Sequence, residues 1–443
     1  MITFIKENHS VDNQKFVAVI GAGPAGLFGA RELANNGVRV ALFNRDFKAG
    51  GLAEYGIFLD KHTMKEGLRK QFRQVLDNAN IDYYGNVSVS KNGDFTIDQI
   101  REMGFDAILV SAGAQGTKWL GLPGEDLEGV YHAKDLVYHY NGLPPFSQKQ
   151  FRIGKRCAII GAGNVMIDIA RYLIYYRDAE DIISIVRRGP SDVNFTKEEM
   201  KHLICYLDME DFENEMKRMH SILDPLHVDV EAGKAKILEA LPKADPKTKN
   251  ARFHFEMLAS PSRMLGENGI LKQLEIEENI LVHENGHTSA KGTGKKHLLD
   301  VDTVIFAIGD KVDDSFGLPA KSNEFIKNEN PKFPIDNISY ESTIEGVFVG
   351  GWSRKASEGL VGYARKDGTH AAKAVLAYLN TKEPNNKITP DDVKAKLNHL
   401  NKPIITKEDI KKLEAVEAEE AKKRGLEEFK FASNDEMLQV MGK

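Results

Sequence analysis

Two glycine-rich segments of this chain have the residue types and spacing that bind the phosphates of a nucleotide. The first segment, Phe16–Gly26, holds Gly21, Gly23 and Gly26 between an apolar stretch and a helical stretch. In such a turn the first glycine permits the bend, the second lets a pyrophosphate approach the backbone, and the third lets the helix pack against the sheet. The N–H groups at the start of the helix then face the phosphates.

The second segment, Arg156–Asp168, repeats this pattern with Gly161 and Gly163, but Met166 occupies the place of the third glycine. We expect this bulkier side chain to push the helix slightly away from the sheet or the turn. Two such turns predict two bound dinucleotides, a combination that is typical of a flavin taking electrons from a nicotinamide.

The elements that must position these turns are predicted from hydrophobic periodicity. After the first turn we expect a helix over 27–36 and a strand over 39–43, and the second unit extends to about Arg188. Further helices are predicted over 61–80, 196–222, 366–378 and 404–425, the last as an exposed tail. Further strands are predicted over 81–90, 106–111, 226–239, 251–259, 270–277, 301–309 and 346–350. The strands between 226 and 277 look antiparallel, and polar loops are expected at 241–250 and 283–296.

The small-residue segments 111–114 and 307–310 share a pattern, which suggests that the chain leaves and re-enters its first domain there. The predicted fold class is therefore α/β, with two Rossmann-like dinucleotide-binding domains, the second inserted in the first. We expect an FAD-binding domain over 1–115 and 310–443, with a helical C-terminal tail. An NADPH-binding domain is expected over 116–309.

The residue at the end of the second strand of each unit indicates which nucleotide the unit binds. An acidic residue there hydrogen-bonds the adenosine ribose, whereas arginines there pair with a 2′-phosphate. The second unit has Arg187 and Arg188 at this point, which predicts NADPH. The first unit has Asn44, which can bond a ribose without a charge, and Asp46 is the alternative. FAD is preferred there over NAD. We expect Asn44→Glu to tighten FAD binding or leave it unchanged, unless Asp46 repels the added carboxylate.

Composition sets further limits on function. The 443 residues carry a formal net charge of −5, which argues against a general nucleic-acid binder. The two cysteines, Cys157 and Cys205, are too few for an internal iron–sulfur cluster and form no CxxC pair. We expect no signal peptide, no membrane span and a reducing, cytoplasmic location. No metal site and no catalytic side chain are predicted, because the flavin carries the chemistry.

Beyond the turns, the sequence resembles the ferredoxin–NADP reductases of the adrenodoxin-reductase type over nearly its whole length. It is also similar, more distantly, to the small subunit of glutamate synthase, whose N-terminal cysteine clusters it lacks. The resemblance rests on GAGPAGLFGA at 21–30, GGLAEYGI at 50–57, GLPGEDLEGV at 121–130, YNGLPP at 140–145, GAGNVMIDIAR at 161–171 and VRRGP at 186–190.

The resemblance implies which residues contact each nucleotide. For FAD these are Ala25, Leu52, Val87, Trp352, Gly359, Leu360 and Val361. For NADPH they are Ala162, Gly163, Asn164, Val165, Arg187, Arg188 and Glu199. The segment 354–358 departs from the family pattern, so the geometry on the nicotinamide side is expected to differ.

The resemblance also implies a function: electron transfer from NADPH through FAD to an external ferredoxin-like iron–sulfur protein, or the reverse. Two alternatives are an electron-input flavoprotein subunit of a larger complex with a cluster-bearing partner, and an NADPH-dependent flavin monooxygenase. Because ferredoxins are commonly acidic, a basic patch should receive the partner. The candidate patches are Lys65, Arg69, Lys70 and Arg73 on one helix, and Arg354, Lys355, Arg365 and Lys366 near the flavin.

Overall fold

The structure is a computed structural model that describes residues 14–284 and 287–443. The chain divides into two compact units. Unit 1 contains the chain up to Thr117, Tyr140–Ser147 and Asp310–Lys443, and unit 2 contains Lys118–His139 and Gln148–Gly309. Residues 140–147 thus group with unit 1, whereas the sequence-based boundaries place them within 116–309. Residues 1–13, where no signal peptide is expected, lie outside the described residues.

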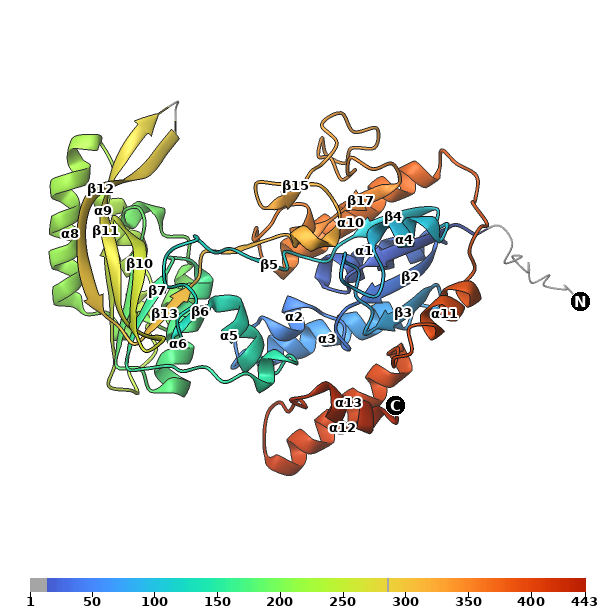
Figure 1. Ribbon diagram of the computed structural model, residues 1–443, viewed down its shortest axis with the longest axis horizontal. Coiled ribbons are helices and arrows are strands. Elements are labelled where there is room, and N and C mark those ends of the chain that lie inside the picture. Colours follow the sequence, from blue (N-terminus) through green and yellow to red (C-terminus); the bar gives the residue numbers. More distant parts are fainter. Residues whose placement is uncertain (1–13, 285–286) are drawn as a thin grey trace, which may run out of the picture. The chain divides into compact units, whose positions relative to one another are not determined.

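Unit 1 is built on a five-stranded parallel sheet in the order β17-β4-β1-β2-β3. The strands are β1 (Phe16–Ile20), β2 (Arg39–Asn44), β3 (Ile81–Gly85), β4 (Ala107–Val110) and β17 (Val347–Val349). Figure 1 shows the blue and cyan N-terminal strands and the orange β17 in this one sheet. The strand order reverses between β1 and β4, and ligands of such sheets bind beyond the carboxyl ends of the strands at that point.

Helices α1 (Pro24–Asn35) and α10 (Val361–Leu379) of unit 1 pack against each other and against this sheet. The other helices of unit 1 are α2 (Leu52–Tyr55), α3 (His62–Leu76), α4 (Ile97–Glu102), α11 (Pro390–Asn398), α12 (Lys407–Arg424) and α13 (Asn434–Met441). Two small antiparallel sheets pair β5 (Gly116–Thr117) with β14 (Asp310–Lys311), and β15 (Ala320–Lys321) with β16 (Glu324–Phe325).

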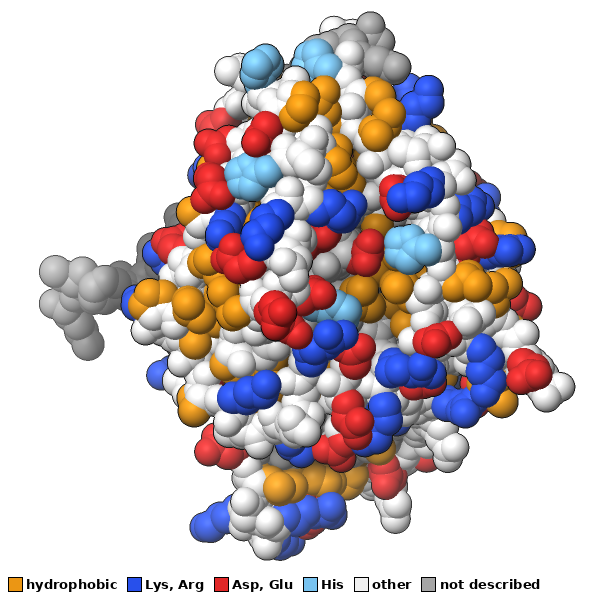
Figure 2. Space-filling view, turned by 90° about the vertical axis from the view of Figure 1, so that its left-hand side faces the viewer, with side chains coloured by type: hydrophobic (Ala, Val, Ile, Leu, Met, Phe, Trp, Pro, Cys, Tyr) orange, Lys and Arg blue, Asp and Glu red, His pale blue; other side chains and the backbone are white. Residues whose placement is uncertain are grey.

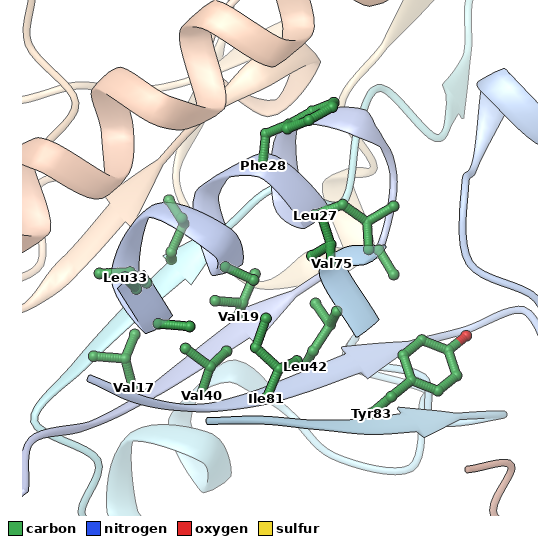
Figure 3. Close-up of a cluster of buried hydrophobic side chains, with 14 of the residues drawn as sticks. Val17, Val19, Leu27, Phe28, Leu33, Val40, Leu42, Val75, Ile81 and Tyr83 are labelled. Carbon is green, nitrogen blue, oxygen red and sulfur yellow. The ribbon is translucent and has the colours of Figure 1, made fainter. Parts of the chain in front are cut away.

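The core that holds the first glycine turn in place lies between α1 and the sheet (Figure 3). Val17 and Val19 of β1 and Val40 of β2 share one face of the sheet because side chains alternate along a strand. Leu27 and Leu33 of α1 pack onto that face, and all five residues are fully buried. Burial of each such side chain contributes about 1.5–3 kcal/mol. The turn between β1 and α1 is therefore fixed at both of its ends.

Unit 2 has a second five-stranded parallel sheet, in the order β6-β13-β7-β8-β9. The strands are β6 (Val130–His132), β7 (Arg156–Ile160), β8 (Asp181–Val186), β9 (Arg252–Met257) and β13 (Thr303–Phe306). A separate antiparallel sheet contains β10 (Ala259–Glu267), β11 (Ile270–Glu284) and β12 (His287–Asp300), drawn in yellow in Figure 1.

The helices that follow and cover these strands are short or of medium length. They are α5 (Ala133–Tyr140), α6 (Asn164–Arg177), α7 (Lys197–Met200), α8 (Met209–Leu223) and α9 (Val230–Leu238). Single-turn 3₁₀ helices in the two units are η2 (Phe146–Gln148), η3 (Pro190–Asp192), η4 (Ile204–Tyr206), η5 (Asp224–Leu226), η6 (Leu241–Lys243), η7 (Asp314–Phe316) and η8 (Gly351–Ser353).

Several element predictions are wrong. The strand predicted over 226–239 is largely helix α9, whose first turn is capped by the Asp229 carboxylate accepting from Ala232 N at 2.8 Å. The strand predicted over 251–259 is not antiparallel to its neighbour, because β9 pairs in parallel with β8. Much of the polar loop predicted over 283–296 belongs to β12, which pairs with β11.

The C-terminal helix is present as predicted, but it is not simply an exposed tail. Ile410 and Leu413 of α12 are buried in the core of unit 1 together with Met437 of α13. Within the described part of the chain, none of the helices combines the length and apolar character that a membrane span requires. The predicted α/β class with two parallel, Rossmann-like sheets is confirmed.

Candidate nucleotide-binding sites

The three glycines of the first turn have different surroundings. A Cβ on Gly21, whose φ is +101°, would lie 2.5 Å from the Ser111 carbonyl oxygen. A Cβ on Gly26 would lie 1.8 Å from the Gly21 carbonyl oxygen. A Cβ on Gly23 would meet no protein atom within 4 Å. The fold itself thus requires Gly21 and Gly26, whereas Gly23 faces open space that a ligand can occupy.

The start of α1 offers hydrogen-bond donors to that space. Gly23 is the N-cap residue and brings no capping side chain. The N–H groups of the first helical turn therefore keep their capacity to bind an anion, and the helix dipole favours negative charge there.

A second glycine pair lies against this turn. Gly50 N donates to Ala22 O at 2.7 Å, and a Cβ on Gly51 would lie 3.1 Å from the Gly23 Cα. Leu52 follows as the first residue of α2 and is partly exposed. The sequence analysis did not assign Gly51 to the site, although two consecutive glycines before a short helix are a sequence feature that could have indicated it.

Asn44 at the end of β2 is buried and bonded within the protein. Its Oδ1 accepts from Ala22 N at 3.0 Å. Its Nδ2 donates to the carbonyl oxygens of Asp46 and Lys48, at 2.9 and 3.0 Å, and lies 3.1 Å from the Tyr83 hydroxyl. The amide hydrogens are thus used to brace the loop after β2 against the glycine turn, rather than being directed at a ribose.

The C-terminal part of unit 1 brings Trp352 to the same end of the sheet. A Cβ on Gly351, whose φ is +63°, would lie 2.6 Å from the Ala25 Cβ, so η8 packs against the start of α1. Trp352 Nε1 donates to Glu358 O at 2.9 Å. Gly359 and the 71% exposed Leu360 then lead into α10 at Val361.

Val87 lies at the carboxyl end of the sheet as well, two residues after β3. Its N–H donates to Asn44 O at 2.8 Å, and its side chain is buried. The predicted FAD residues therefore gather around one end of one sheet. Asp367 supports them, because its carboxylate accepts from Gly351 N at 2.6 Å, a contact that the sequence did not suggest.

The second glycine turn repeats the geometry of the first. A Cβ on Gly161, whose φ is +133°, would lie 2.4 Å from Ala307 O, whereas a Cβ on Gly163 would meet nothing within 4 Å. Gly163 is the N-cap residue of α6 and brings no capping side chain. Met166 is fully buried, and its N–H donates to Gly163 O at 3.0 Å. The open glycine at the helix start recurs although the third glycine is missing.

The loop after β8 is bonded to this turn. Asn194 N donates to Ala162 O at 2.8 Å, and Thr196 N donates to Asn164 Oδ1 at 2.9 Å. Thr196 also caps α7, which carries the partly buried Glu199. The exposed Val165 lies on the first turn of α6.

Arg187 and Arg188 follow directly after β8. Arg187 is exposed, and the Arg188 guanidinium lies 3.1 Å from the Asp192 carboxylate. The predicted NADPH residues thus also gather at one sheet end, with Arg188 already paired to an acid of this chain.

Most basic side chains of the helix predicted as a docking patch form ion pairs within the protein. Lys65 and Arg69 of α3 bind Glu428, and Arg69 also binds Glu54 at 2.7 Å. Arg73 binds Glu66 and Glu414. The acidic partners come from α2, from α3 itself and from the C-terminal segment, which the sequence does not place there. They offset the charge of Lys65, Arg69 and Arg73, whereas Lys70 is exposed.

Arg354 is also not available for docking. Its side chain is 8% exposed and its Nη2 lies 2.6 Å from Asp367 Oδ1. Lys355 pairs with Glu358. Arg365 and Lys366 remain exposed on α10. On the face seen in Figure 2, which carries elements of unit 2, basic and acidic side chains are mixed rather than gathered by sign.

Comparisons with known proteins agree with this geometry. A family model described as pyridine nucleotide-disulphide oxidoreductase matches residues 15–206. The NADPH-ferredoxin reductase FprA of Mycobacterium leprae is 26% identical, and the alignment covers 82% of this chain and 84% of the relative. The mitochondrial NADPH:adrenodoxin oxidoreductase of Salvelinus fontinalis is 26% identical, and the alignment covers 96% of this chain and 90% of the relative.

Among solved structures, Mycobacterium tuberculosis FprA in complex with NADPH superposes with a TM-score of 0.81 at 23% identity, covering 97% of this chain and 100% of that one. The resemblance found in the sequence motifs is confirmed. The chain has the fold of Mycobacterium tuberculosis FprA, its residues 15–206 match the pyridine nucleotide-disulphide oxidoreductase model, and its sequence is similar to NADPH-ferredoxin and NADPH:adrenodoxin reductases.

Proposed function

We propose that this chain is an NADPH-dependent FAD oxidoreductase that passes electrons between NADPH and an external iron–sulfur protein. The observation that carries the proposal is the repeated open glycine at a helix start. Gly23 and Gly163 each face space without protein atoms, whereas Gly21 and Gly161 are closely packed against backbone. Gly23 and Gly163 have φ values of −74° and −113°, so the backbone does not require glycine at either position, and both fit the pyrophosphates of two dinucleotides.

Unit 1 is proposed to bind FAD and unit 2 to bind NADPH. The basis is the residue chemistry after the second strand of each sheet. Unit 2 presents Arg187 and Arg188, whose guanidinium groups match a 2′-phosphate. Unit 1 presents no arginine pair there, and its FAD contacts are proposed to be the following residues: Gly21, Gly23, Ala25, Gly26, Leu52, Val87, Trp352, Gly359, Leu360 and Val361.

The residues of the protein bind and orient the two nucleotides. The starts of α1 and α6 stabilise the pyrophosphates through N–H groups and helix dipoles. FAD, when bound, supplies a centre that takes two electrons from a nicotinamide and releases them one at a time. No side chain of the chain has to act as acid, base or nucleophile in this scheme.

The electrons have to leave the protein. The chain contains two cysteines, and burial raises the pKa of the Cys157 thiol to about 12, so it stays protonated. A cluster needs about four thiolates. The acceptor is therefore external, and an iron–sulfur protein is the partner proposed. Both cysteines are free thiols, which suits a reducing compartment such as the cytoplasm.

The test is the absorption spectrum of the purified protein, with FAD added, during anaerobic titration with NADPH. We expect flavin bands that bleach with NADPH and return when an oxidised ferredoxin is added. A protein that binds no flavin would contradict the proposal. NADPH-driven oxygenation of an organic substrate without a ferredoxin would favour a monooxygenase instead.

A further inference from the structure

We propose that Asp192 is a specificity-determining residue that competes with the 2′-phosphate of NADPH for Arg188 and so weakens the preference for NADPH over NADH. This inference rests on the proposed assignment of unit 2 to NADPH. It concerns a carboxylate that lies within the predicted phosphate site itself.

The two arginines of the site differ in their partners. Arg188 Nη2 lies 3.1 Å from Asp192 Oδ1, and the two side chains are 34% and 29% exposed. Among the described residues, no carboxylate lies within ion-pair distance of Arg187, which is exposed. One guanidinium is thus open to a phosphate, and the other already carries a counter-charge that a phosphate has to displace or share.

Asp192 is held in place by its backbone. It is the last residue of η3, and its N–H donates to Gly189 O at 3.1 Å. Ser191 Oγ donates to Asp229 O at 2.7 Å, just before α9. A Cβ on Gly233 of α9 would lie 2.6 Å from the Pro190 carbonyl carbon, so that helix is pressed against η3.

The other end of the loop is fixed to the glycine turn. Asn194 N donates to Ala162 O, and Lys236 Nζ binds Val193 O. The backbone at Asp192 is therefore held from both sides of the loop, which keeps the carboxylate within side-chain reach of Arg188.

Two effects of Asp192 on NADPH binding oppose each other. The carboxylate orients Arg188, but a partly exposed ion pair has little effect on stability. It also repels a 2′-phosphate that carries more than one negative charge, and it holds the guanidinium that should neutralise that charge. The repulsion is the larger effect, so removing the charge should tighten binding of the phosphorylated nucleotide only.

The experiment compares the wild-type holoenzyme with Asp192→Asn by calorimetric titration with adenosine 2′,5′-bisphosphate and with AMP. We expect the dissociation constant for the bisphosphate to fall about three- to tenfold and that for AMP to stay unchanged. NADP⁺ against NAD⁺ should give the same pattern. Equal changes for both ligands, no change, or weaker bisphosphate binding would overturn the inference.

Two further variants separate this inference from the proposed function. Asp178→Asn is the matched control, because Asp178 forms an exposed ion pair with Lys249 just after the opposite end of α6 and has a φ of +49°, which Asn tolerates. It should change neither constant. In an Arg188→Ala background, Asp192→Asn should lose most of its effect.

If Arg187→Ala with Arg188→Ala leaves bisphosphate binding unchanged, the NADPH assignment of unit 2 fails. If Arg188→Ala weakens bisphosphate binding but Asp192→Asn does not strengthen it, the assignment stands and only the role of Asp192 fails.

Discussion

Single glycines at the two turns have separable roles. Gly26 is required by packing, since a Cβ there would lie 1.8 Å from Gly21 O. Gly23 is required by no neighbour in the protein, because a Cβ there would meet nothing within 4 Å. One sequence motif thus contains two glycines that the fold requires, Gly21 and Gly26, and one that faces the space proposed for the ligand.

We predict that Gly23→Val folds normally but loses flavin. The added side chain enters the space proposed for the pyrophosphate, and we expect FAD affinity to fall at least about 100-fold, or about 2.7 kcal/mol. Flavin content after denaturation and the thermal midpoint check both parts.

Gly26→Ala is the contrasting variant. Its clash with the Gly21 carbonyl should lower the free energy of unfolding by about 3 kcal/mol or more, since neither backbone can move freely. Normal flavin content in Gly23→Val would contradict the first-site assignment.

Asn44 leads to a second prediction, opposite to the sequence-based expectation for Asn44→Glu. The Nδ2 of Asn44 donates to two carbonyl oxygens, and a glutamate would place a carboxylate against them. We expect the variant to lose about 2–3 kcal/mol of stability and to bind FAD more weakly. Denaturant unfolding and the FAD dissociation constant measure this.

Asp46→Asn serves as the control for Asn44→Glu. The main-chain oxygen of Asp46 accepts a hydrogen bond from the Asn44 amide, and Asp46→Asn leaves that oxygen in place. Tighter FAD binding by Asn44→Glu would contradict this prediction and would support the original expectation that residue 44 binds the ribose.

At the scale of elements, a buried ion network joins the C-terminal segment to α2 and α3. Its members are Lys48, Glu54, Lys65, Arg69, Glu417, Glu428 and Lys430. Glu54 is 1% exposed and bonds Arg69, Lys48 and Lys430. Glu54 lies two residues after Leu52, so the network also holds the short helix that lies against the first glycine turn.

The network predicts a specific dependence of stability on pH. Burial alone would raise the pKa of Glu428, but Lys430, Lys65 and Arg69 outweigh it and lower that pKa to about 2. The contribution of the ionised Glu428 is therefore complete above its unfolded pKa and is lost as the pH falls from about 4.5 to 2.

We expect Glu428→Gln to lower the free energy of unfolding by about 3 kcal/mol at pH 7. The difference from wild type should shrink between about pH 4.5 and 2, because the wild-type carboxylate is protonated there. Denaturant unfolding across that range measures it. Glu427→Gln, at the exposed neighbour, should behave as wild type, and an equal loss in both variants would argue against the network.

At the scale of the whole molecule, the proposed acidic acceptor has to dock on a chain whose formal net charge is −5. Arg31 and Arg365 lie 4.6 and 4.7 Å from the centre of the Phe28 ring, on α1 and α10. Among the described residues neither guanidinium forms an ion pair with a carboxylate, and Arg365 Nη1 donates to Gln71 Oε1 at 3.4 Å. Burial and the neighbouring Arg365 lower the pKa of Arg31. This pair, next to the exposed Lys366, is the docking candidate that we test in unit 1.

We predict that reduction of an acidic ferredoxin slows as salt rises, because exposed charges are screened within about 8–10 Å at physiological ionic strength. Arg31→Glu with Arg365→Glu should lower kcat/KM for the ferredoxin about tenfold or more at low salt. Ferricyanide reduction, which needs no docking, should change little.

Lys412→Glu with Lys422→Glu is the matched control, because it changes the net charge equally at exposed positions of α12. Ferredoxin reduction that is insensitive to salt and to both double variants would favour a stable partner interface instead.

The glycine turns, the arginine pair and the resemblance to the reductases could be predicted from sequence, because each depends on residues close together in the chain. Gly21 to Gly26 fold as one local unit, and the strand and helix around them have a clear hydrophobic period. The α/β class follows from two such units.

The tertiary structure decided what depends on distant residues. Asn44 proved to be a loop brace because its partners are main-chain carbonyls whose positions depend on the folded loop. Arg69 proved to be ion-paired because its acids come from α2 and from a segment more than 350 residues away. Parallel β9 and helix α9 were missed because pairing partners and a capping Asp229 outweighed a short apolar pattern. Hydrophobic period reports burial, but it does not report which charged or hydrogen-bonding group lies on the other side of a contact.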